Sequence, residues 1–211
     1  MPRNAHHPRR HGAAAAADSP PDLRQRIVTT ARQLLEQRGP AALSLREVAR
    51  RAGATHQAPY HHFANREAIL AELVAIGFDE LADALAAANQ ALARRGRRAG
   101  VVASGMAYVE FALANPGLFR IMFRHDVVDP RHAPAVRAAG DRAHGELRRL
   151  VEGVHAAPDA ELATLYWALV HGLACLLVDG PLAGVLPDDS ARRAHAQAVL
   201  RRLADALVGR G

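Results

Sequence analysis

The chain has 211 residues, of which 50% are hydrophobic, and a formal net charge of +6. This length and apolar content provide enough surface for a core and exclude a wholly disordered chain. The single cysteine, Cys175, excludes an internal disulfide framework, and no apolar run with a cleavage site follows the polar N-terminal residues, so we expect a cytoplasmic protein. We interpret the most apolar segment, residues 162–178, as a buried helix and not as a membrane span, because Thr164 and His171 lie inside it.

The basic charge is concentrated in the first third of the chain. Residues 1–67 contain 11 arginines and 5 acidic residues, whereas residues 68–211 contain 16 of each. Arginines that neutralise phosphates release condensed counterions, so a basic segment joined to a neutral one favours contact with a polyanion. Residues 1–21 show no amphipathic period and end in two prolines, and we interpret them as a flexible basic arm.

A helical period begins after this arm. Apolar residues at helical spacing predict a first helix over residues 22–38, which the pair Gly39-Pro40 would end. Ser44 stands three residues before Glu47, the spacing of a capping box, and predicts a short second helix that ends near residue 52.

A third helix is predicted directly after a glycine-bearing turn. Thr55 is its N-cap candidate, so the helix would begin at His56 and hold Pro59 in its first turn, where a proline costs less than in a helix interior. Two short helices joined by a tight turn and preceded by a longer helix are typical of a helix-turn-helix unit, whose second short helix lies in the DNA major groove.

The remainder of the chain also has a helical pattern. No segment shows sustained period-two alternation, so we expect an all-α fold without a sheet. Residues 94–98 carry four arginines and are interpreted as an exposed link, because cations are favoured near a helix C-terminus. Residues 118–123 form a short apolar segment. The other expected helices are residues 66–93, 101–114, 129–154, 158–178 and 187–208.

One segment of the chain resembles the N-terminal DNA-binding domain of the TetR family of bacterial transcriptional repressors. It is residues 27–70, IVTTARQLLEQRGPAALSLREVARRAGATHQAPYHHFANREAIL. The likeness rests on the Ala-x-x-Leu first helix, Gly39, Ser44, Val48-Ala49, Ala52-Gly53, Tyr60, Phe63 and Arg66-Glu67. Further on, Trp167-Ala-Leu-Val-His171-Gly172 resembles the Trp-His-Gly signature of one group of TetR-type C-terminal domains. Pro59 and the pair His56-Gln57 depart from the common family pattern, so the operator sequence does not follow by analogy.

The resemblance implies a domain organisation and a function. We expect a basic arm (1–21), a helix-turn-helix DNA-binding domain (22–67) and a helical effector-binding and dimerisation domain (68–211). The implied protein is a homodimer joined through the last two helices of each subunit. It would bind a palindromic double-stranded DNA operator, as a repressor, and be released by a small, mainly hydrophobic or aromatic ligand. We expect no cofactor, no metal and no membrane association.

Side chains near the start of the third helix are the candidates for DNA contact. Those best suited to base edges are His56, Gln57 and His61, and of these Gln57 can pair bidentately with adenine. Those better placed for phosphates, where they would set the register, are Thr55, Tyr60 and Arg66. The family resemblance implies the same phosphate role for Ser44 and Arg46.

A ligand site is predicted around Trp167 and His171, which lie four residues apart on one helical face. Its other candidate residues are Tyr108, Phe111, Phe119, Met122 and Phe123. A mostly apolar cavity with one polar group would accept a small hydrophobic or aromatic effector. A packed core, or a dimer seam with a satisfied histidine, remains an open alternative.

Two other classes of function use the same region. His171, Cys175 and Asp179 continue along one face and could form a nucleophilic site, but apolar surroundings raise the pKa of a thiol, so we expect no enzyme. A metal-responsive regulator would use His144, His155, His171 or Cys175, which show no compact ligand spacing.

Overall fold

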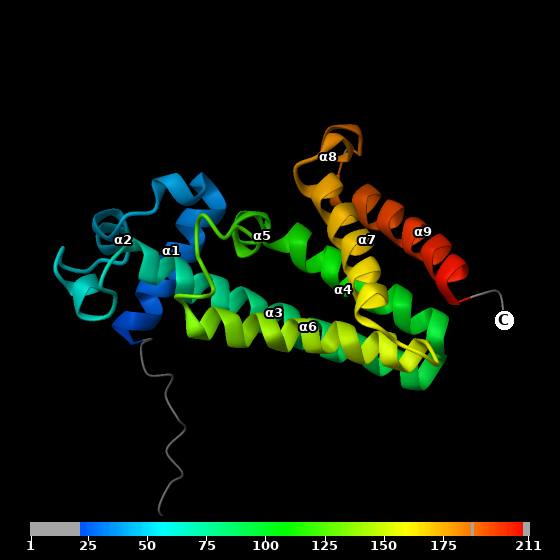
Figure 1. The fold of residues 1–211 in the computed structure, drawn as a ribbon. Helices are drawn as coiled ribbons and strands as arrows, with labels where there is room; N and C mark the ends of the chain where they lie inside the picture. The colour runs from blue at the N-terminus through cyan, green and yellow to red at the C-terminus, as the bar shows by residue number, and fades with distance from the viewer. Residues whose placement is uncertain (1–21, 187, 209–211) are drawn as a thin grey trace, which may run out of the picture.

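The computed structural model describes residues 22–186 and 188–208, which form nine α-helices and two short 3-10 helices. No strand occurs in these two ranges, which confirms the all-α prediction. The predicted basic arm lies outside the described residues. Figure 1 shows a small N-terminal unit at one end of the molecule and long helices that extend away from it.

The first helix, α1 (Leu23–Arg38), buries the predicted face. Four of its side chains are fully buried at 0% exposure: Ile27, Ala31, Leu34 and Leu35. The helix ends at Gly39, whose φ of 73° suits glycine and whose N–H donates to the Leu35 carbonyl at 2.8 Å. The 3-10 helix η1 (Pro40–Ala42) then leads to α2.

The second helix, α2 (Leu45–Arg51), has the predicted N-cap. The Ser44 hydroxyl accepts a hydrogen bond from the Glu47 N–H at 3.2 Å. Gly53 follows with a φ of 63°, a left-handed conformation that lets the chain turn sharply. The predicted cap at Ser44 and the predicted turn at Gly53 are confirmed.

The predicted third α-helix is wrong in its start and in its type. The structure has instead a 3-10 helix, η2 (Ala58–His61), without a side-chain cap. An α-helix from His56 would need the Pro59 nitrogen to donate to Thr55, but proline has no N–H and its ring crowds that carbonyl. Instead the Ala58 N–H donates to the Thr55 carbonyl at 3.0 Å, and the Tyr60 N–H donates to the Gln57 carbonyl at 3.1 Å, both in the tighter three-residue pattern.

The longest helix is α3 (Arg66–Arg95), which the Asn65 side chain caps by accepting from the Ala68 N–H at 2.8 Å. It runs without a break across the expected domain boundary after residue 67. Residues 94–98 are exposed as predicted, but the link itself is one residue, Gly96 with a φ of 84°, because α4 (Arg97–Ala114) begins directly after it. Glycine turns the chain at this one position, so the arginines on both sides remain helical.

The remaining helices are α5 (Pro116–Met122), α6 (Pro134–Val154), α7 (Ala160–Val178), α8 (Pro181–Val185) and α9 (Asp189–Val208). The sequence did not predict α8. Helix α6 begins inside its expected range, at Pro134, and proline is favoured in the first turn. The expected start of the last helix, residue 187, lies outside the described residues. In Figure 1, α6 runs beside α3 in the same direction, while α7 and α9 pack on α4.

The apolar core is continuous between the two ends of the molecule. One buried cluster extends from Ile27 of α1 to Leu200 of α9, and a second, smaller one includes Val101, Leu150 and Tyr166. The N-terminal unit is therefore packed directly against the longer helices and shares their core.

Helix α7 is less buried than predicted. Alone among the helices of residues 22–186 and 188–208, it is long and apolar enough to cross a membrane by length and composition, and 28% of its most apolar window is buried. Tyr166 and Leu177 face the core, but Leu165 and Leu176 are 44% and 43% exposed. The description of a buried helix is thus correct for one face only.

Internal cavity and candidate nucleic-acid interface

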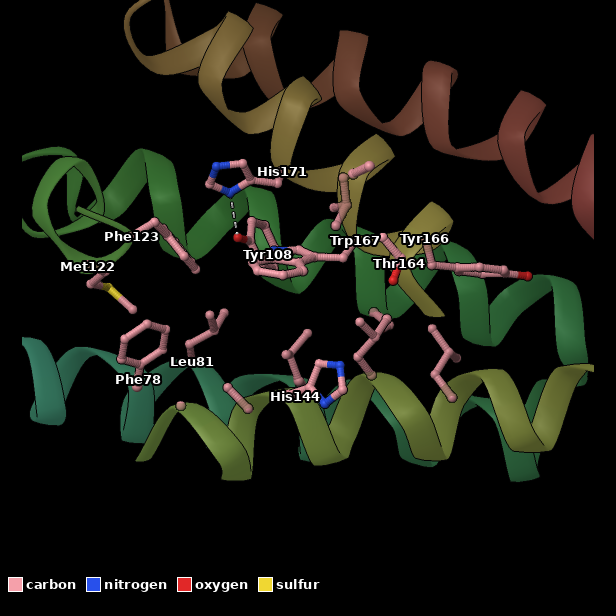
Figure 2. Close-up of a pocket in the computed structure, with 18 of the residues that line it drawn as sticks. Phe78, Leu81, Tyr108, Met122, Phe123, His144, Thr164, Tyr166, Trp167 and His171 are labelled. Carbon is pink, nitrogen blue, oxygen red and sulfur yellow. Dashed lines mark hydrogen bonds between the residues drawn. The ribbon is translucent and has the colours of Figure 1, made fainter. Parts of the chain in front are cut away.

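A cavity of about 690 Å³ lies between α3, α4, α5, α6, α7 and α9. Figure 2 shows the side chains that line it from both sides. Five of the seven predicted ligand residues are among them: Tyr108, Met122, Phe123, Trp167 and His171. Its size falls within the range of about 300–1,000 Å³ that is usual for small-molecule sites.

The other two predicted residues do not line the cavity. Phe119 is buried behind it, with its ring centroid 6.1 Å from that of Tyr108 and 5.4 Å from that of His171. Phe111 is 7% exposed and belongs to the general core. Phe119 therefore supports the lining residues from behind, and Phe111 has no part in the site.

One end of the cavity is built from aromatic rings. The centroid of Phe123 lies 5.4 Å from that of Phe78, 4.6 Å from that of His171 and 6.1 Å from that of Trp167. Such edge and tilted arrangements are favourable between aromatic rings, so these side chains hold one another in place. Sequence reasoning missed Phe78, and also Ser104, which lies one helical turn before Tyr108 on α4.

The polar pair in the cavity wall is uncharged. The Tyr108 hydroxyl lies 2.9 Å from His171 Nδ1. Burial lowers the pKa of His171 and raises the pKa of Tyr108, so neutral pH leaves the imidazole and the phenol both neutral. At the other end of the cavity, Tyr166 bonds to His155 Nε2 at 2.8 Å, and burial raises the pKa of this tyrosine to about 12.

The cysteine beside this pair does not have the electrostatic surroundings of a nucleophile. Cys175 Sγ lies 3.5 Å from His171 Nε2, but burial, with the nearby Asp179 charge, raises the pKa of the thiol. A thiol with a raised pKa is protonated and unreactive at neutral pH. Within the described residues, no group of three His, Cys, Asp or Glu side chains is placed to hold a metal ion.

The N-terminal unit presents a second surface, made of exposed polar side chains. Pro59 of η2 and Phe63, which follows η2, are both buried, and they fix this turn to the core of the unit. The predicted DNA-contacting residues that are exposed around this turn are Thr55, His56, Gln57, Tyr60 and His61. The rings of His56 and Tyr60 have centroids 6.0 Å apart, which groups a hydroxyl and an imidazole on one side of the turn.

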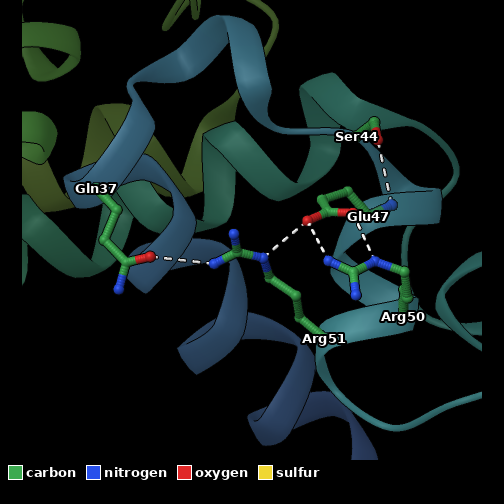
Figure 3. Close-up of polar contacts among 5 residues, drawn as sticks. All are labelled: Gln37, Ser44, Glu47, Arg50 and Arg51. Atoms are coloured by element: carbon green, nitrogen blue, oxygen red, sulfur yellow. Dashed lines mark hydrogen bonds and ion pairs between the residues drawn. The ribbon is translucent and has the colours of Figure 1, made fainter.

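Helix α2 holds most of its charges in an internal network, which Figure 3 shows. The Glu47 carboxylate accepts from Arg50 at 2.9 and 2.8 Å and from Arg51 at 2.8 Å. These hydrogen bonds lower the pKa of Glu47 to about 2, so it stays ionised and offsets one of the two arginine charges. Arg51 also donates to Gln37 Oε1 at 3.1 Å, which ties α2 to α1. Glu47 therefore does not turn back to complete the predicted capping box.

Arg46 differs from its neighbours on α2. Its side chain is exposed and forms no ion pair among the described residues, whereas Arg50 and Arg51 share Glu47. Ser44 is exposed too, although its hydroxyl already caps the helix. Of the three arginines of α2, Arg46 is therefore the one that shares its charge with no carboxylate of the described residues.

Arg66 has an intramolecular task. Its Nε donates to the Leu43 carbonyl at 2.9 Å and its Nη2 to the Pro40 carbonyl at 2.6 Å. These bonds fasten the segment before α2 to the start of α3. This geometry argues against the predicted phosphate contact, because two of the guanidinium nitrogens are already committed to the domain's own backbone.

A polar junction joins the N-terminal unit to the cavity wall. The Glu36 carboxylate on α1 accepts from the N–H groups of Gly117 and Leu118 at 2.6 and 2.9 Å. Nearby, Arg32 donates to Glu80 and to Asn115 Oδ1, the latter at 2.7 Å. The anchored amides begin α5, whose last residue, Met122, lines the cavity together with the following Phe123.

An all-helical chain with a capped short helix, an exposed polar turn and a separate internal cavity has the architecture of a helix-turn-helix regulator with a ligand-binding domain. Comparisons with known proteins agree. The N-terminal pattern of the bacterial regulatory proteins of the tetR family matches residues 27–73, and the tetracyclin repressor-like C-terminal domain matches residues 101–205. The chain belongs to the TetR family of DNA-binding transcriptional regulators.

The similar proteins include regulators from several bacteria. HTH-type transcriptional regulators of Mycobacterium tuberculosis and Mycobacterium bovis are 28% identical over 147 residues, which span 70% of this chain and 60% of each relative. A protein of unknown function from Rhodococcus sp. RHA1 is 30% identical, with 92% of this chain and 100% of that one covered and a TM-score of 0.73. A TetR-family transcriptional regulator from Pectobacterium atrosepticum is 27% identical, with 89% and 94% covered and a TM-score of 0.63. The family consists of regulators and not of enzymes, in agreement with the prediction.

Proposed function

We propose that the protein is a homodimeric repressor that binds a palindromic operator and releases it when a small, mainly apolar ligand enters the cavity. The observation that carries this proposal is the junction through which α5, part of the cavity wall, holds α1 of the DNA-binding unit by Glu36. A ligand can drive release only if it binds one arrangement of these parts better than the other. We propose domain limits of 22–67 and 68–211, and membership of the Trp-His-Gly group for the second domain.

The operator contacts that we propose are Ser44, Arg46, Thr55, His56, Gln57, Tyr60 and His61. Their exposure around α2 and η2 supports this role, and Arg46 replaces Arg66 as the principal phosphate contact. The side chain of Gln57 matches the donor and acceptor pattern of adenine in the major groove.

A gel shift with DNA that flanks the protein's own gene tests this proposal. Gln57→Ala should relax the preference at one base position, whereas Arg46→Ala should weaken all sites and reduce the salt slope by about one per protomer. Arg50→Ala is the matched control, because this exposed arginine of the same helix is ion-paired with Glu47, and its removal should reduce the salt slope less. Binding without sequence preference, or binding that does not fall steeply with salt, would contradict the proposal.

The dimer that we propose uses the uncovered faces of α7 and α9. Leu165, Leu169, Gly172 and Leu176 follow one another along the outer face of α7 at helical spacing, and the three leucines are 39–44% exposed. A Cβ built on Gly172 would meet nothing within 4 Å, so this glycine leaves room for a partner helix. Exposed apolar surface of this kind is typical of an interaction site.

Sedimentation of two variants tests the dimer. Leu169→Arg places a charge in the proposed interface and should yield a monomer. Val185→Arg adds the same charge at a 73% exposed position on α8 and should leave the dimer intact. A wild-type monomer, or equal effects of the two variants, would refute the proposed interface.

A further inference from the structure

The wall of the cavity contains one buried polar group that is not occupied by another part of the protein. Ser104 is 5% exposed and lines the cavity from α4, and its hydroxyl takes part in none of the side-chain hydrogen bonds of residues 22–186 and 188–208. A hydroxyl carries one donor and two acceptor lone pairs, so a serine that lines the cavity without such a bond is suited to a bound molecule.

The other hydroxyls that line the cavity are already engaged. Tyr108 bonds to His171 at 2.9 Å, Tyr166 bonds to His155 at 2.8 Å, and the Thr164 hydroxyl donates to the Ala160 carbonyl at 2.8 Å. The lone pairs of these hydroxyls can still accept a hydrogen bond from a ligand, but the Thr164 proton is committed to Ala160 and each tyrosine hydroxyl is already paired with a histidine. Ser104 is the one among these four hydroxyls that makes no such bond, so it can donate its proton to a ligand oxygen without displacing another bond.

The arginine, the aspartate and two of the histidines that line the cavity remain in contact with water. Arg137, Asp141 and His144 lie along α6 and are exposed, and so is His125. The inner wall is made of groups such as Phe78, which carry no charge. An ionised group buried there would lose its hydration without gaining a partner of opposite charge.

We propose that the cavity takes an uncharged, mainly apolar effector with a single hydrogen-bonding oxygen, which bonds to the Ser104 hydroxyl. The body of this molecule packs against the aromatic end formed by Phe78, Phe123 and Trp167. The inference rests on the proposed function, since it names the chemical class that the effector site selects.

Four probes with one biphenyl skeleton separate the possible classes of ligand. They are 4-biphenylmethanol, 4-methylbiphenyl, biphenyl-4-carboxylate and 4-biphenylmethylammonium. Trp167 is the only tryptophan and lines the cavity, so quenching of its fluorescence reports binding to the full-length protein without DNA. The alcohol should bind at least about tenfold more tightly than either ion, because the ions would be buried without a partner.

The variant Ser104→Ala tests the hydrogen bond. It should weaken the binding of the alcohol by about 3- to 10-fold and change the binding of 4-methylbiphenyl by less than about twofold, since only the alcohol can form a hydrogen bond with the serine. Thr164→Val is the matched control on the same cavity: its hydroxyl is committed to Ala160, so the preference for the alcohol should persist. Thermal unfolding of each variant confirms that it is folded.

Three results would overturn the inference. An ion that binds as tightly as the alcohol would refute the uncharged class, and equal losses for the alcohol and 4-methylbiphenyl in Ser104→Ala would refute the oxygen contact. Binding of every probe more weakly than about 1 mM would refute the cavity as a site for such molecules. These titrations contain no DNA, so they are independent of the operator gel shift. If the titrations fail and the gel shift succeeds, only this inference is refuted. If the titrations succeed and the gel shift fails, only the proposed regulatory function is refuted.

Discussion

The close contact between α1 and α5 predicts that alanine at Gly117 lowers the stability of the protein, whereas alanine at the uncrowded Gly145 of α6 raises it. Gly117 is the second residue of α5, and a Cβ built there would lie 2.8 Å from the Leu35 carbonyl oxygen and 2.9 Å from Glu36 Cα. Both are backbone atoms of α1, so no rotamer change can move them away. Gly145 lies inside α6, and a Cβ built there would meet nothing within 4 Å.

The expected magnitudes follow from two effects. Replacing a helical glycine by alanine stabilises a helix by about 0.5–1 kcal/mol, because the unfolded chain loses conformational freedom. Inserting a methyl group into a filled contact costs about 1–3 kcal/mol. For Gly117→Ala both effects apply, and we expect a net destabilisation of about 0.5–2 kcal/mol. For Gly145→Ala only the first applies, and we expect a gain of about 0.5–1 kcal/mol.

Thermal unfolding followed by circular dichroism measures both variants. For a chain of this length, 1 kcal/mol shifts Tm by about 2–4 °C, so Gly117→Ala should fall by about 1–8 °C and Gly145→Ala should rise by about 1–4 °C. All samples need the same protein concentration, because the Tm of an oligomer depends on it. If Gly117→Ala were as stable as Gly145→Ala, the close approach of α5 to α1 would be refuted.

Three other substitutions test separate parts of the structure. Ser44→Ala should destabilise the protein by about 1 kcal/mol in urea unfolding, because it removes the N-cap of α2. Burial lowers the pKa of His171 in the folded protein, so the unfolded chain takes up a proton at a higher pH than the folded one. Stability therefore falls as the pH drops below the ordinary histidine pKa. The decrease in Tm between about pH 7.5 and 5.5 should be smaller in His171→Gln than in the wild type. Arg66→Met leaves the Leu43 and Pro40 carbonyls without their donor and should cost about 1–3 kcal/mol. The salt dependence of its DNA binding should stay unchanged, whereas a reduced salt slope would support the predicted contact between Arg66 and a phosphate.

The local features of the N-terminal unit could be predicted because their causes lie within a few residues. The cap at Ser44 depends on an amide three residues away, and the end of α1 depends on the freedom of Gly39. The third helix was predicted wrongly because the cost of Pro59 was judged small in a first helical turn. Its ring also disfavours the four-residue pattern for the residues before it, and the chain turns as a 3-10 helix.

The cavity was predicted only in part, since its walls come from helices far apart in the chain. Trp167 and His171 share a face of α7 and could be paired from their spacing. Ser104 and Phe78 face the same space from α4 and α3, and their register relative to α7 depends on how these helices pack. A local pattern also could not show that Arg66 faces the backbone at residues 40 and 43, because that contact requires the folded N-terminal unit.

The position of α5 restricts how the cavity can affect the DNA-binding unit. This helix has seven residues; its first amides are held by Glu36 of α1 and its last turn borders the cavity. A helix this short, close-packed against α1 at Gly117, has little room to absorb a displacement by bending. In the proposed mechanism, a ligand that pushes Met122 or Phe123 would either break the hydrogen bonds to Glu36 or move α1 with α5. Either outcome would alter how α5 holds α1, so the energy of these few contacts would limit the proposed coupling between ligand and operator.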